Sequence, residues 1–119
     1  MSKIFLDDLR NPPDDSWQIA RTYLQAIYAL GLYFESLEVI SLDNDLGEEK
    51  EGYDVLCFIE KIYDGFHPPF EIRIHTKNTE AERKMKACIA AMKRRGYKSL
   101  TMPSEVADLL AIFDTLKES

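Results

Sequence analysis

The sequence has few cysteines, no excess of positive charge and no long apolar run, and each of these limits what the protein can be. Cys57 and Cys88 have neither the density of a disulfide-stabilised fold nor the paired spacing of a zinc site, so we expect two buried, reduced thiols. The chain does not open with a signal-peptide pattern, and no apolar run approaches the length needed to cross a membrane. We therefore expect a cytoplasmic protein with no membrane partner.

The charge balance argues against general binding to nucleic acid. The formal net charge is -6, so the field of the whole chain repels duplex nucleic acid and anionic membranes. The one concentration of basic residues, between Arg83 and Lys98, lies along a predicted helix and just beyond it, and a solvated helix face explains it better than a docking surface for an RNA end. We expect no general duplex binding.

The composition is that of one folded domain. A chain of 119 residues with 45% apolar residues is long enough for one ordinary core and too short for two, and a disordered chain would have far fewer large apolar groups. We treat residues 1–119 as a single domain.

Apolar periodicity predicts strands that alternate with helices. Alternating or short apolar runs indicate strands at about 3–6, 17–20, 38–43, 70–75 and 98–102. Three-to-four-residue spacing indicates helices at about 22–34, at 55–63, from Asn78 or Thr79 to Gly96, and from Pro103 onward; Thr79 and Glu82 have capping-box spacing. This order predicts an α/β fold, a three-layer sandwich in which a mainly parallel sheet of four to five strands has helices on both faces.

Acidic residues follow two of the predicted strands, and a histidine follows a third. Asp7 and Asp8 come directly after the first strand, Asp43 and Asp45 follow the middle strand, and His75 ends the strand at 70–75. Ligands of open parallel sheets gather at the carboxyl ends of the strands, so we expect these side chains to meet at one edge. Carboxylates that meet in this way repel one another unless a cation or a shared proton intervenes.

Oxygen ligation of this kind suits Mg²⁺ or Mn²⁺ better than zinc, so a divalent ion is the economical hypothesis. Such an ion assists phosphoryl transfer or orients water, while a nearby carboxylate accepts a proton or is itself a phosphoryl acceptor. His75 could protonate a leaving oxygen, bind phosphate, or serve only as a hydrogen-bonded structural residue. Arg10 could bind phosphate bidentately or neutralise Asp8. Asn78 marks a helix N-terminus whose free backbone donors could receive an anion.

Four sequence blocks together resemble a known family. They are Phe5-Leu6-Asp7-Asp8-Leu9-Arg10-Asn11-Pro12, Ser41-Leu42-Asp43-Asn44-Asp45-Leu46-Gly47, Gly52-Tyr53-Asp54 and Ile74-His75-Thr76-Lys77-Asn78. In this order, over about residues 3–92, they resemble the cyclic-phosphate-processing receiver-like domain family. The resemblance implies a flavodoxin-like, receiver-like fold and activity on a cyclic phosphate of RNA or a nucleotide.

The resemblance also assigns roles to individual residues. Set beside ordinary receivers, Asp7 and Asp8 match the metal-binding acid pair, and Asp43 looks like the phosphoacceptor. Three features depart from an ordinary receiver: a proline loop replaces the first helix, His75 precedes Thr76 at the strand end, and Thr101-Met102-Pro103 has methionine where receivers have lysine.

The leading hypothesis is therefore a metal-assisted phosphoesterase or phosphate-end processing domain. It has Asp7, Asp8 and Asp43 at the metal, Asp43, Asp45 and His75 in catalysis, and Arg10, Thr76 and Asn78 at the phosphate of a small molecule or RNA end. The alternatives are a signalling module phosphorylated on Asp43, and a non-enzymatic module that binds a ligand or a protein partner.

Overall fold

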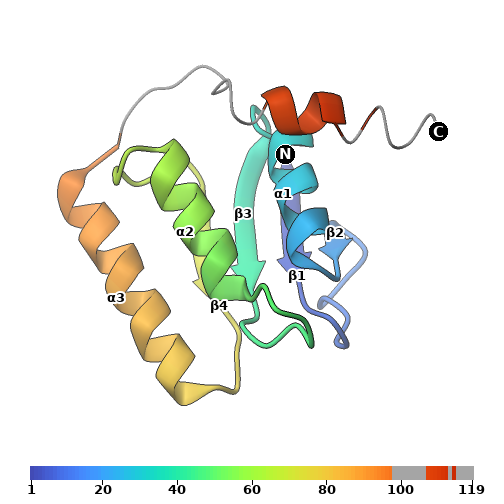
Figure 1. The fold of residues 1–119 in the computed structure, drawn as a ribbon, viewed down its shortest axis with the longest axis horizontal. Helices are drawn as coiled ribbons and strands as arrows, with labels where there is room; N and C mark the ends of the chain where they lie inside the picture. Colours follow the sequence, from blue (N-terminus) through green and yellow to red (C-terminus); the bar gives the residue numbers. More distant parts are fainter. Residues whose placement is uncertain (98–106, 113, 115–119) are drawn as a thin grey trace.

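The computed structural model describes residues 1–97, 107–112 and 114 (Figure 1). Strands and helices alternate along the chain. The elements are β1 (Ser2–Leu6), β2 (Trp17–Ala20), α1 (Tyr23–Leu32), β3 (Leu37–Leu42), α2 (Gly52–Ile62), β4 (Glu71–Ile74) and α3 (Thr79–Arg95). None of the helices in these ranges is long and apolar enough to span a membrane.

The four described strands form one parallel sheet in the order β2-β1-β3-β4. The predicted receiver-like, flavodoxin-like α/β fold is confirmed. Because all four strands run the same way, their carboxyl ends lie along one edge of the sheet. The backbone ladder also continues one residue past three strands, since the N–H groups of Asp7, Asp43 and His75 donate to the carbonyls of Ala20, Leu6 and Leu42.

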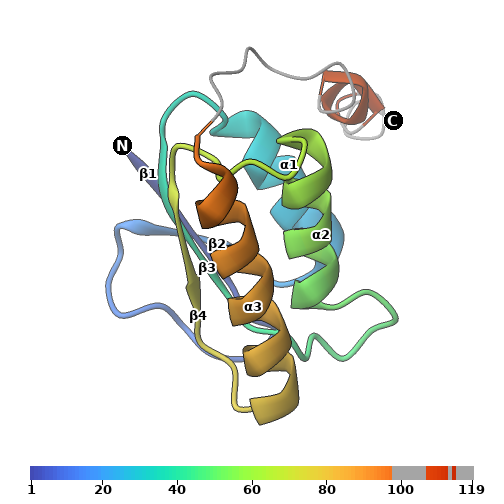
Figure 2. The same ribbon diagram turned by 90° about the vertical axis from the view of Figure 1, so that its left-hand side faces the viewer.

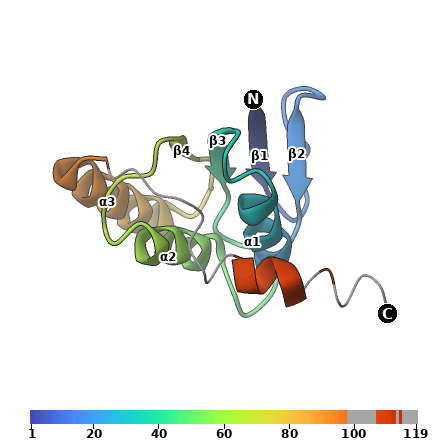
Figure 3. The same ribbon diagram turned by 90° about the horizontal axis from the view of Figure 1, so that it is seen from above.

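In the described part of the chain, α1, α2 and α3 lie on one side of the sheet (Figure 3). The β1–β2 loop, residues 7–16, runs on the other side (Figure 2). Right-handed crossovers explain the difference, because the β1 to β2 connection moves across the sheet in the opposite direction to the others. The connection from β1 to β2 contains no helix. We predicted helices on both faces of the sheet, but the described residues place helices on one face only.

The main core lies between the sheet and the three helices. Ile4 and Leu6 of β1 and Ile40 and Leu42 of β3 are fully buried there. Burying a side chain of this size stabilises the fold by about 1.5–3 kcal/mol. Phe5 is also buried but lies outside this core, because it points to the opposite face of β1.

The predicted elements differ from the observed ones mainly at their ends. Helix α1 is shorter than predicted, because it ends at Leu32 with Tyr33 as its C-cap, just after Gly31. Asn78 caps α3, since its side-chain oxygen accepts from the N–H of Ala81, rather than Thr79 in a capping box. The predicted strand at 98–102 and the Thr101-Met102-Pro103 motif lie outside the described residues, as does the start of the last predicted helix; residues 107–112 and 114 are helical.

The burial of His67 predicts a stability that depends on pH. Its side chain is 3% exposed. Nδ1 donates to the Pro68 carbonyl at 2.7 Å, while Nε2 has no hydrogen-bond partner among the described residues. Burial lowers the pKa of His67 below its ordinary value of 6.5. Below pH 6.5, His67 is protonated in the unfolded chain but stays neutral in the folded chain until the pH is lower. The unfolded state therefore binds more protons, and the free energy of unfolding falls as pH falls.

We expect His67→Asn to weaken this dependence. Denaturant unfolding at about pH 7.5 and about pH 5.5, on either side of the ordinary histidine pKa, should show a smaller loss of stability than in the wild type. The quantity to compare is the change in the free energy of unfolding between the two pH values. Its absolute value is not suitable, because the substitution also leaves a cavity that lowers stability at every pH. An equal change in both proteins would contradict the prediction.

Candidate functional site

The side chains that follow the strands meet at the carboxyl edge of the sheet. Asp7, Asp8 and Asp43 each offer a carboxylate oxygen, and these oxygens all lie within 4.8 Å of one another. These three residues line a hollow of about 490 Å³ together with Asp45, and we call it the rim hollow. We call Asp7, Asp8, Asp43 and Asp45 the acidic rim. Its oxygen donors are the kind that Mg²⁺ and Mn²⁺ prefer, so the residues present fit a divalent ion.

Asp7 is the most constrained carboxylate of the acidic rim. Its Oδ1 accepts from the N–H groups of Leu9 and Arg10, at 2.9 and 2.7 Å. Its Oδ2 accepts from Arg10 Nε at 2.8 Å and lies 3.2 Å from His75 Nε2. Burial raises the pKa of Asp7, but these backbone N–H groups and the Arg10 guanidinium outweigh it, so the pKa is lowered and the group stays ionised. Asp8 and Asp43 are thus the more accessible ligands for an ion.

Arg10 links three strand ends. In addition to its bond with Asp7, its Nη2 donates to the His75 carbonyl at 2.9 Å and lies 3.6 Å from Asp43 Oδ2. Arg10 therefore pairs with Asp7 rather than with Asp8, the partner considered from the sequence. Its side chain is 44% exposed, so part of the guanidinium remains accessible to an anion beside the acidic rim.

His75 is held between a hydroxyl and a carboxylate. Ser41 Oγ lies 2.7 Å from Nδ1, and the ring stacks on Phe5 with the centroids 4.3 Å apart. An ionised carboxylate only accepts, so the bond to Asp7 places the proton on Nε2 and leaves Nδ1 to accept from Ser41. Burial lowers the pKa of His75, although Asp7 acts in the opposite direction. The neutral ring therefore presents Nε2–H toward the acidic rim.

The start of α2 packs against the backbone of Asp43. Gly52 N–H donates to the Asn44 carbonyl at 2.9 Å, and Asn44 Oδ1 accepts from the N–H of Tyr53 at 3.0 Å. A Cβ added to Gly52 would lie only 1.8 Å from the Asp43 carbonyl oxygen. The backbone of α2 and the end of β3 are therefore in direct contact, and a side chain at Gly52 has no space.

A sequence profile of the family described as "Cyclic-phosphate processing Receiver domain" matches residues 2–91, well over half of the chain. The chain belongs to this family. The matched range runs from β1 into α3 and contains the whole acidic rim and His75. The suspected resemblance is therefore confirmed. Searches of curated proteins and of solved structures found no match.

In this receiver domain the two remaining predicted phosphate ligands, Thr76 and Asn78, make hydrogen bonds to other residues of the protein. Asn78 Nδ2 donates to Asp45 Oδ1 at 3.3 Å, while its oxygen caps α3. Thr76 Oγ1 accepts from the N–H of Asn78 at 3.2 Å. Their roles as phosphate ligands stay predictions, as does the catalytic role of Asp45.

Four residues contribute to the site without having been predicted to. Ser41 orients His75, Lys77 lines the rim hollow, and Gly52 packs on Asp43. Arg21 holds the β1–β2 loop, since Nη1 donates to the carbonyls of Asp7 and Arg10 and Nη2 donates to Asn11 Oδ1. Arg21 directly follows β2, so the strand-end argument that selected the acids also identifies it. Ser41 had a weaker signal, a hydroxyl two residues before Asp43 and hence on the same face of the strand.

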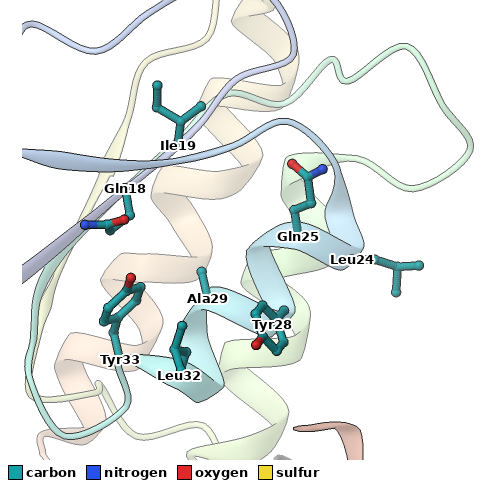
Figure 4. Close-up of a pocket in the computed structure, with 8 residues that line it drawn as sticks. All are labelled: Gln18, Ile19, Leu24, Gln25, Tyr28, Ala29, Leu32 and Tyr33. Atoms are coloured by element: carbon teal, nitrogen blue, oxygen red, sulfur yellow. The ribbon is translucent and has the colours of Figure 1, made fainter. Parts of the chain in front are cut away.

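A separate hollow of about 330 Å³ lies between β2 and α1 (Figure 4). Its lining includes Ile19, Leu24 and Leu32, which are about half exposed, together with two tyrosines and two glutamines. None of the described residues that line it carries a formal charge, so they offer no phosphate or metal ligand of the kind found at the acidic rim.

Proposed function

We propose that this receiver domain is a metal-assisted phosphoesterase that processes a cyclic phosphate on a nucleotide or at an RNA end. The observation that supports the proposal is the meeting of Asp7, Asp8 and Asp43 with Arg10 and His75 at one edge of the sheet, in a chain of this family. An ordinary structural ion pair needs one acid, whereas three carboxylates this close offer a site for a cation.

Hydrolysis of a cyclic phosphate requires water to attack the phosphorus atom and one P–O bond of the phosphate ring to break. The departing oxygen must then gain a proton. A divalent ion held by Asp8 and Asp43, with Asp7, would offset the charge of the phosphate and lower the pKa of water. Asp45 orients the attacking water or completes the ion's ligand shell, and Arg10 steadies a phosphate oxygen. His75 donates a hydrogen bond from Nε2 to a phosphate oxygen, and Ser41 holds the ring in the tautomer that carries its proton there. To act as the general acid the ring must first be protonated on both nitrogens, with Ser41 Oγ accepting from Nδ1–H, so that the ring is neutral again once the departing oxygen has taken the Nε2 proton.

The test is hydrolysis of adenosine 2′,3′-cyclic phosphate followed by chromatography of the monophosphate products. We expect turnover with Mg²⁺ or Mn²⁺, loss of turnover in EDTA, and recovery when the ion is restored. Turnover that is unaffected by the chelator would contradict the metal-assisted mechanism.

A second candidate is a signalling receiver phosphorylated on Asp43. It is favoured by the position of Asp43 at the end of β3, beside Asp7 and Asp8 in a receiver fold. Intact mass after incubation with acetyl phosphate and Mg²⁺ separates the two functions. A mass gain that depends on Asp43, without hydrolysis of the cyclic phosphate, would favour signalling.

A further inference from the structure

The face of the sheet opposite the helices carries a row of rings that leads away from the acidic rim. His75 stacks on Phe5, with the centroids 4.3 Å apart, and Phe5 meets Trp17 edge to face at 5.9 Å. The strand register pairs Lys3 with Trp17 and Phe5 with Ile19, so these side chains share one face. Two ring contacts therefore connect the edge strand β2 to the histidine of the candidate site.

A hollow of about 450 Å³ lies at the far end of this row. We call it the loop hollow; its lining is Asn11, Pro12, Pro13, Asp14, Asp15, Trp17 and Ile19. The indole of Trp17 is held by Phe5 and by Lys3, whose Nζ lies 5.5 Å from the ring centroid. Arg21 holds the loop wall through Asn11 and Arg10. The aromatic ring that bounds the hollow, and the loop residue Asn11 beside the two prolines, are thus held by contacts from outside the hollow.

The two hollows are lined by different charges, so each favours a different part of a ligand. Asp14 and Asp15 are the only charged residues in the described lining of the loop hollow, whereas Lys3 and Arg21 contact its walls from outside, through Trp17 and Asn11. The lining itself therefore disfavours a phosphate. Arg10 and Lys77 line the rim hollow, where a phosphate finds cations and a fit for a metal ion. A flat, uncharged group with hydrogen-bond donors on its edge suits the loop hollow, because prolines and indole offer apolar faces and the two carboxylates accept.

We propose that the loop hollow binds the nucleobase of the substrate while the phosphate lies at the acidic rim. Consecutive residues of one segment line both hollows: Leu9 and Arg10 line the rim hollow, and Asn11 and Pro12 line the loop hollow. This inference rests on the proposed function and narrows its substrate to a nucleotide or RNA end that carries a base. Base stacking on an aromatic side chain tolerates all four bases, so we infer selection for a base rather than for one sequence.

Trp17 is the only tryptophan of the chain, so its fluorescence reports directly on the loop hollow. We expect adenosine 2′-monophosphate to quench this fluorescence in the full chain with Mg²⁺, and ribose 5-phosphate or inorganic phosphate at equal concentration to leave it unchanged. Calorimetry should show that Trp17→Ala weakens nucleotide binding by about 5- to 150-fold, the range for loss of one base–aromatic stack. Trp17→Phe should retain most of the affinity, and Leu24→Ala, in the groove between β2 and α1, should not change it.

The kinetic comparison separates this inference from the proposed function. With adenosine 2′,3′-cyclic phosphate, Trp17→Ala should raise KM and leave kcat nearly unchanged, whereas ribose 2′,3′-cyclic phosphate should be a poor substrate for both proteins. Equal kcat/KM for the two substrates in the wild type, with no effect of Trp17→Ala, would overturn the base site and leave the phosphoesterase intact. Nucleotide quenching without turnover would support the base site and contradict the phosphoesterase.

Discussion

Asp43→Asn should lower kcat/KM for a 2′,3′-cyclic phosphate by roughly 10²–10³-fold, the usual cost of removing one group that stabilises developing charge in a transition state. Asp43 is 6% exposed, and its Oδ2 lies 3.6 Å from Arg10. The amide keeps the shape of the side chain but removes the negative charge that an ion needs. Chromatography of the cleavage products under saturating Mn²⁺ measures the loss.

A stability measurement distinguishes this loss from misfolding. Without metal, the variant should melt at or above the temperature of the wild type, because one of the mutually repelling carboxylates of the acidic rim is gone. Adding Mn²⁺ should raise the melting temperature of the wild type and have a smaller effect on Asp43→Asn. Glu38→Gln is the matched control, since Glu38 is an exposed acid on the same strand. An active Asp43→Asn protein with normal metal stabilisation would contradict the assignment.

Gly52→Ala should destabilise the domain by about 3 kcal/mol, at the upper end of the range for overpacking. Helix propensity alone predicts the opposite sign, since alanine is favoured over glycine by about 1 kcal/mol within a helix. The new methyl group would lie 1.8 Å from the Asp43 carbonyl oxygen and 2.8 Å from its carbon, both of which are backbone atoms. Denaturant unfolding measures the change, and we also expect a smaller Mn²⁺ effect because the end of β3 must move.

Gly96→Ala provides the comparison. A Cβ at Gly96 meets no atom of residues 1–97, 107–112 or 114 within 4 Å, but the residue has a φ of 82°, so alanine there costs backbone strain. This variant should lose stability and keep the full response to Mn²⁺. If Gly52→Ala is as stable as the wild type, the close contact between α2 and β3 does not restrict that position.

The sequence predicted the strands and the acidic rim because both follow from short-range patterns. Apolar runs that end in charge mark where β1 and β3 leave the core, and parallel strands bring those ends to one edge. Asp7, Asp43 and His75 share that edge for this reason. Membership of the family was predicted from four blocks, none of which is specific alone.

The pairing of side chains within the site was not predictable, because it depends on size and direction across strands. The hydroxyl of Ser41 in β3 contacts His75, whose ring stacks on Phe5 of β1. The choice of Asp7 over Asp8 as the partner of Arg10 depends on a turn in which both Leu9 and Arg10 donate to Asp7. The contact of Gly52 with Asp43 joins residues whose closeness no periodicity indicates.

The β1–β2 loop is short for the crossover that it makes. Parallel strands usually need a connection of a dozen or more residues, whereas only residues 7–16 join β1 to β2. Removing residues would therefore strain the pairing of the two strands, but lengthening the loop at its exposed residues Asp14 and Asp15 costs little, about 0.6 kcal/mol for each doubling of a flexible loop. Since this segment also forms a wall of the loop hollow, insertions there offer an evolutionary route to new ligand preferences that leaves the sheet register and the acidic rim in place.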